Sequence, residues 1–131
     1  MYNPSYQPVA EALHVTLARE GVHVGDTAAY PRVECHSFVE NTPQDKGDAV
    51  RVLACVVESM SVTSPEEAAG MNADNLALIQ TLDGYIYTSG TTTFEVIGIV
   101  PTQFQDMTET SDPQKILYRA LQSIDIYVQQ I

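Results

Sequence analysis

The sequence predicts an α+β fold, with an antiparallel-rich sheet of four to five strands and two helices packed against it, in the order α-β-β-α-β-β. Two apolar-rich runs, 30–40 and 49–60, flank a polar insert that contains Pro43 and Gly47. This pattern is typical of two antiparallel strands joined by a long hairpin loop. Apolar residues at helical spacing before and after the hairpin predict the two helices, and a β-branched and aromatic stretch at 85–105 predicts further strands.

Size and charge limit the classes of protein that fit. The chain has 131 residues, 44% of them hydrophobic, which predicts a single globular domain over 1–131. Its net charge of −11 argues against a nucleic-acid-binding surface, because such a surface needs clustered Lys and Arg. The first residues lack the basic segment and apolar core of a signal peptide. Since no apolar run reaches the roughly 20 residues that span a bilayer, we expect an intracellular soluble protein and no membrane partner.

The two helices are expected at 4–20 and 64–82. The first repeats apolar residues at a four-residue spacing, namely Val9, Leu13 and Leu17. The second begins with a strong signal, because Ser64 fits the N-cap, Pro65 the first helical position, and Glu67 the partner of Ser64 in a capping box. Its apolar stripe consists of Ala68, Met71, Leu78, Ile79 and Leu82, and it is interrupted by Asn75.

Regular alternation predicts which hairpin residues face the core. One face of the first strand carries Val33, Cys35, Ser37 and Val39, and one apolar face of the second carries Val50, Val52, Ala54 and Val56. If both faces cover one core, Val39 lies opposite Val50. This register sends Cys35 and Cys55 to opposite faces, so we expect two free thiols, as is usual in a reducing compartment. The spacing of Cys and His matches no metal-ligand motif.

The C-terminal half is expected to add strands. Residues 85–88 predict a short strand, a turn follows at Ser89–Gly90, and 93–100 predict a main strand in which Gly98 marks a bulge. Pro101 indicates an edge position or the end of that strand. The polar stretch 105–114 then predicts a second long loop. The last run, 115–131, fits a helix or a strand; the strand is favoured because it gives the preceding strand a partner.

No catalytic constellation is present in the sequence. It contains no P-loop, dinucleotide-binding, zinc-protease or nucleophile-elbow motif. Cys35 and His36 are adjacent on one strand and point to opposite faces, so the imidazole does not reach the thiol. Helix capping and solubility account for Glu66 and Glu67 and for the acidic residues of the second loop. We therefore expect no enzyme, no cofactor and no bound metal.

The order and pattern of these elements are similar to those of the tail-completion or tail-terminator proteins of long-tailed bacteriophages. The residues that carry the resemblance are EALHVTLAREG, the hairpin YPRVECHSFVENTPQDKGDAVRVLACVVESM, the helix SPEEAAGMNADNLALIQTL and the closing KILYRALQSIDIYVQ. Together they cover nearly the whole chain, although no single motif among them is specific.

The resemblance implies a structural virion protein at the tail–neck junction, assembled in the host cytoplasm. Such a protein forms a homo-oligomeric ring, commonly a hexamer, that caps the tail tube and joins it to the neck or connector proteins of the head. An acidic lumen would let DNA pass without specific binding.

On this interpretation the two long loops become candidate protein contacts. In the first loop they are Asn41, Gln44, Asp45, Lys46 and Asp48, and in the second they are Asp106, Glu109 and Asp112. A solvated hairpin tip explains the first loop equally well. Two other functions remain open at this point: a neck or head–tail connector protein, and a small cytoplasmic dimeric α+β binding module.

Overall fold

The computed structural model describes residues 7–25, 29–41, 50–112 and 115–131. Its elements are, in order, α1 (Gln7–Leu17), β1 (His23–Val24), β2 (Arg32–Asn41), β3 (Val50–Ser61), α2 (Pro65–Gln80), β4 (Ile86–Ser89), β5 (Thr92–Asp112) and β6 (Lys115–Gln130). The strands form one six-stranded sheet in the order β1-β2-β3-β6-β5-β4. The sheet is mixed, because β1 runs parallel to β2 while every other neighbour pair is antiparallel.

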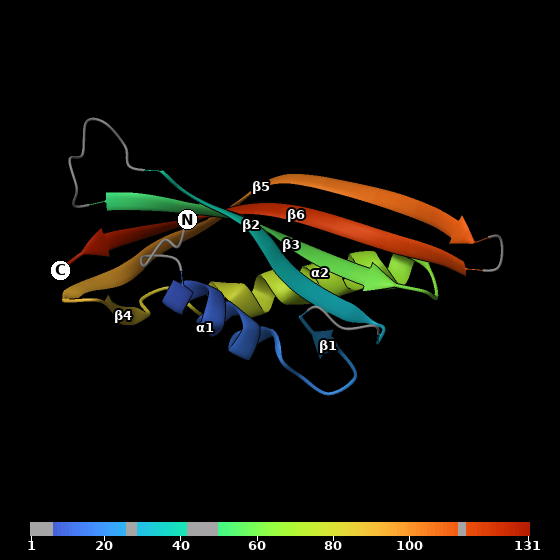
Figure 1. Ribbon diagram of the computed structural model, residues 1–131, viewed down its shortest axis with the longest axis horizontal. Coiled ribbons are helices and arrows are strands. Elements are labelled where there is room, and N and C mark those ends of the chain that lie inside the picture. The colour runs from blue at the N-terminus through green and yellow to red at the C-terminus, as the bar shows by residue number, and fades with distance from the viewer. Residues whose placement is uncertain (1–6, 26–28, 42–49, 113–114) are drawn as a thin grey trace.

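The predicted fold class, an antiparallel-rich sheet of four to five strands in the order α-β-β-α-β-β, is therefore wrong: the sheet has six strands and is mixed. The order is α-β-β-β-α-β-β-β, in a sheet that is curled rather than flat. The strand β1 has two residues, too few to show any alternation in the sequence. The expectation that both helices pack against the sheet is correct, since α1 and α2 lie on the same side of it (Figure 1).

The start of α2 agrees with its sequence signal. The Ser64 hydroxyl accepts a hydrogen bond from the Glu67 backbone N–H at 3.0 Å, and Pro65 is the first helical residue. The capping box is only half formed, because the Glu67 carboxylate accepts a hydrogen bond from the Ser61 hydroxyl instead. Ser61 Oγ in turn accepts hydrogen bonds from the backbone N–H groups of Thr63 and Ser64, so β3 and α2 are joined by a tightly bonded turn.

Replacing Ser64 by Ala should lower the free energy of unfolding by about 1 kcal/mol, because the Glu67 N–H loses its acceptor at the N-cap. Chemical denaturation followed by circular dichroism would measure the change. The matched control is Thr63→Ala, since Thr63 is exposed and its side chain does not cap the helix. Equal effects of the two substitutions would contradict the capping role.

The register of the β2–β3 hairpin differs from the predicted one. Val39 pairs with Ala54 rather than Val50, and Cys35 pairs with Val57. In the predicted register Cys35 would lie opposite Ala54, so the pairing differs by three residues before Ser37 and by four after it. The fourth residue comes from a bulge between His36 and Val39, where Ser37 has a φ of 61°. The extra residue reverses the facing of everything after it, so Val39 is 53% exposed while Val33 is buried.

The facing of β3 is also the reverse of the predicted one. Leu53, Cys55 and Val57 point into the core, and the alternate residues face away from the helices. Cys35 and Cys55 are both buried in the core and both free, so the expected free thiols are present without the predicted separation onto two faces. Burial raises the pKa of Cys35 to about 12.

The core lies between the helices and one face of the sheet. The stripe predicted on α1 is buried, as are Ala68, Met71 and Ile79 of α2. The interrupting Asn75 is fully buried, and its Nδ2 donates to Ser59 Oγ of β3 at 2.8 Å. A polar residue therefore sits within the apolar stripe because the strand beneath it supplies a partner.

The last two strands form a long hairpin that extends past the end of β2 and α2 (Figure 1). The favoured strand over 115–131 is confirmed as β6. The predicted loop over 105–114 is wrong, because β5 continues through Pro101 to Asp112. A bulge does occur beside Gly98, and two more interrupt the ladder near Pro101 and Thr110.

Candidate interaction surface

The outer edge of β5 is open for most of its length. On that side β4 pairs only with Thr92–Glu95, and the last backbone hydrogen bonds join Val96 to Gly84 and Tyr85. From Ile97 onward β5 has β6 on one side and no strand on the other within the described parts of the chain. Open backbone N–H and C=O groups of this kind are a template for pairing with another chain.

Apolar side chains accompany this open edge. Ile97, Val100, Phe104 and Met107 are exposed by between 40% and 47%. Every residue from Pro101 to Thr110 is exposed, although Asp106, Met107 and Thr108 also lie against the start of α2. An exposed apolar strand with an unpaired edge is a marker of protein–protein association.

The opposite edge of the sheet is formed by β2 and is also largely uncovered. The short strand β1 pairs only with Arg32 and Val33. From Glu34 to Asn41, β2 has no second strand neighbour among the described residues. The exposed Val39 lies on this edge, just past the bulge at Ser37.

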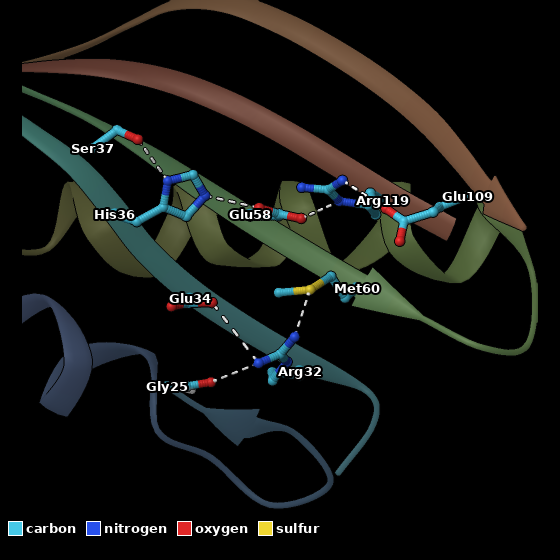
Figure 2. A network of polar contacts seen from close by, with 9 residues as sticks. All are labelled: Gly25, Arg32, Glu34, His36, Ser37, Glu58, Met60, Glu109 and Arg119. Carbon is cyan, nitrogen blue, oxygen red and sulfur yellow. Dashed lines mark hydrogen bonds and ion pairs between the residues drawn. The ribbon is translucent and has the colours of Figure 1, made fainter. Parts of the chain in front are cut away.

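A polar network joins four strands on the face of the sheet opposite α2 (Figure 2). Its centre is Glu58 on β3, whose side chain is only 5% exposed. Glu58 Oε1 bonds to His36 Nε2 of β2 at 2.8 Å, and Glu58 Oε2 accepts from Arg119 Nε of β6. Arg119 also donates to Glu109 Oε2 of β5 at 3.1 Å.

These partners keep Glu58 ionised. Burial alone would raise the pKa of its carboxyl group, but the hydrogen bonds and charges of Arg119 and His36 outweigh it, so the pKa of Glu58 is lowered. The same pairing raises the pKa of Arg119. The network thus holds the base of the β5–β6 hairpin to β2 and β3.

A second polar group lies beside this network at the start of β2. Arg32 donates to Met60 Sδ at 3.1 Å and to the Gly25 carbonyl at 3.4 Å, and it lies 3.8 Å from a Glu34 carboxylate oxygen (Figure 2). Its guanidinium also stacks over the Tyr30 ring. These contacts hold Gly25, which follows β1, and Tyr30 beside the start of β2.

Half of the predicted contact residues, Gln44, Asp45, Lys46 and Asp48, lie outside the described residues. Asn41 is the last residue of β2. Asp106, Glu109 and Asp112 belong to β5 rather than to a loop, which corrects their predicted setting. Asp106 and Glu109 are exposed on the hairpin, and Glu109 takes part in the Glu58 network.

Asp106 also borders a small cleft of about 140 Å³ between the start of α2 and the β5–β6 hairpin. The lining residues are Pro65, Ala68, Ala69, Asp106, Met107, Thr108, Tyr118, Arg119 and Ala120. The cleft is small and formed mainly by small or apolar side chains, so it adds an apolar recess beside the open edge.

Sequence reasoning missed both the Glu58 network and the open edge. A carboxylate within the apolar run VLACVVESM was a usable signal for the network, because a charge at a strand position that becomes buried requires a partner. The open edge had no such signal, since it depends on where β4 stops pairing. His36 does point away from Cys35, as the alternation implied.

Among the described residues, no group of three or more His, Cys, Asp or Glu side chains is placed to hold a metal ion. Neither α1 nor α2 has the length and apolar character needed to cross a membrane. No protein-family model matches the sequence, and no curated protein matches it.

Proposed function

We propose that this chain is a structural protein of a bacteriophage virion, whose copies form a ring that caps the tail tube and joins it to the head or neck. The observation that carries the proposal is the sheet with an open edge on each side, β2 and β5, and with both helices on one face. A subunit with two different association edges suits a head-to-tail assembly, which closes into a ring when the rotation between copies permits.

Two further features support the proposal. The sequence segments similar to tail-completion proteins correspond to α1, the β2–β3 hairpin, α2 and β6, which together supply most of the core. The net charge of −11 suits a ring through which DNA slides without being held. The long β5–β6 hairpin offers a projecting contact element toward a neighbouring protein of the virion.

Light scattering and electron microscopy of the purified protein test the proposal. We expect rings of uniform mass that bind to one end of isolated phage tail tubes. A monomer or a dimer at every concentration, with no binding to tail tubes, would contradict it and would favour the small dimeric binding module. Rings that bind isolated connectors but not tubes would favour a neck or connector protein.

A further inference from the structure

We infer that neighbouring copies join edge to edge, with the outer edge of β5 in one copy pairing antiparallel with the outer edge of β2 in the next. The six-stranded sheet would then continue from subunit to subunit. This inference deepens the proposed function and rests on its ring.

The strand directions permit this joint. From β2 to β3, from β3 to β6 and from β6 to β5, each neighbour pair is antiparallel. The two edge strands β2 and β5 therefore run in opposite directions. When a second copy is set beside the first in the same sheet, its β2 meets β5 antiparallel, which is the more stable ladder.

Residues that are paired from strand to strand across β2, β3, β6 and β5 form rows, and these rows give the register of the joint. One row on the face opposite the helices runs Val39, Ala54, Asp125, Val100. Both valines at its ends are exposed, Val39 by 53% and Val100 by 46%. Joining copies at the same height places Val100 of one beside Val39 of the next, and removes two exposed apolar side chains from water.

The same register holds over the part of the β2 edge that β1 leaves open. The row that begins at Glu34 passes through Glu58 and Leu121 and ends at Gln105. Counting along the strands, Val39–Val100 and Glu34–Gln105 belong to one unbroken antiparallel pairing, and no like charges face each other in these two pairs. The pairing ends there, because β1 already lies beside Arg32 and Val33.

The bulges explain why the register is unbroken. β2 has one extra residue between His36 and Val39 relative to β3, and β5 has one extra residue between Pro101 and Phe104 relative to β6. The two bulges lie in neighbouring rows. Between any two rows on either side of both bulges, the edges of β2 and β5 therefore have the same number of residues. A bulge usually protects an edge against pairing, but two matched bulges on facing edges leave the pairing intact on either side. Pro101, which lacks an N–H, falls within the interrupted segment.

Cysteine crosslinking tests this joint directly. A Val39→Cys/Val100→Cys variant, treated with a short bifunctional thiol reagent, should give a ladder of covalent oligomers that stops at the ring size. Both sites are exposed, so the fold should be kept. The natural Cys35 and Cys55 should not react, since both are buried and burial raises the pKa of each thiol. The control, Val39→Cys/Thr108→Cys, lies on the same two edges but out of register, and should not crosslink.

Each other result has a distinct meaning. Dimers formed by Val100→Cys alone would show that two β5 edges meet about a two-fold axis, and would overturn the joint. Rings in light scattering that give no ladder in the in-register variant would overturn the joint while leaving the ring intact. A chain that never oligomerises would overturn both the joint and the proposed function.

Discussion

Replacing Glu58 by Ala is expected to lower the free energy of unfolding by about 2–4 kcal/mol, because Arg119 Nε and His36 Nε2 both lose the buried carboxylate that binds them and Arg119 keeps only the exposed Glu109. We expect a smaller loss of stability than for a fully buried ion pair, because the Arg119 side chain is 24% exposed to solvent. Urea denaturation of the wild type and the variant at neutral pH would measure the change. The control is Glu109→Ala: its side chain is 51% exposed, so its loss should cost at most about 0.5 kcal/mol.

The pH dependence of the stability that Glu58 contributes gives a second test of the network. Because the pKa of Glu58 is lowered in the folded chain from its ordinary value of 4.5, its contribution is complete above that value and is lost as the pH falls through the lower folded pKa. The difference in stability between the wild type and Glu58→Gln should therefore shrink in acid. A difference that stays constant down to strongly acidic pH would show that the charge of Glu58 is not what stabilises the sheet.

Replacing Val100 by Lys is expected to dissociate the ring while leaving the subunit folded. Lysine on an exposed edge is a common natural device against strand pairing, because its charge must be desolvated when a second strand docks. We expect the dissociation constant of the joint to rise by at least about thirtyfold, equivalent to about 2 kcal/mol. Sedimentation over a range of protein concentrations would measure it.

The control for this variant is Ile86→Lys. Ile86 is also exposed, by 55%, but it lies on β4 and outside the proposed joint. This variant should assemble like the wild type. If Val100→Lys also assembled like the wild type, the edge of β5 would not be the joint.

The elements with strong local signals were predicted well. The stripe of Val9, Leu13 and Leu17 and the N-cap at Ser64 depend on neighbours within one or two helical turns, and both agree with the structure. The strand over 115–131 was favoured because of its pairing with the preceding strand, and it pairs there.

The errors in facing had two causes. The bulge at Ser37 reversed the facing of Val39 and moved the register after it by one residue, because strand facing alternates with period two. The core face of β3 was wrong because its more uniformly apolar face, with Val50, Val52, Ala54 and Val56, points away from the helices. A φ of 61° at a serine has no clear signal in one sequence. The polar stretch around Asp106 looked like a loop because it is exposed on a projecting hairpin, where solvent rather than secondary structure decides its composition.

The candidate site was the least predictable part. The open edges of β2 and β5 exist because β1 and β4 stop pairing after a few residues, which is a property of the whole sheet. Matching the two edges required the register of every intervening strand. Sequence alone does not contain that information without the position of both bulges.

Hydrogen–deuterium exchange on the assembled protein tests the edge-to-edge joint most directly. Outward-pointing backbone amides around Glu34–His36 of β2 and Val100–Gln105 of β5 should exchange much more slowly in the assembled wild type than in the unassembled Val100→Lys variant, since both edges gain hydrogen-bond partners. The amides of α1 should exchange equally in the two samples. Protection that appears on α1 while β2 and β5 exchange at the same rate in both samples would contradict the account.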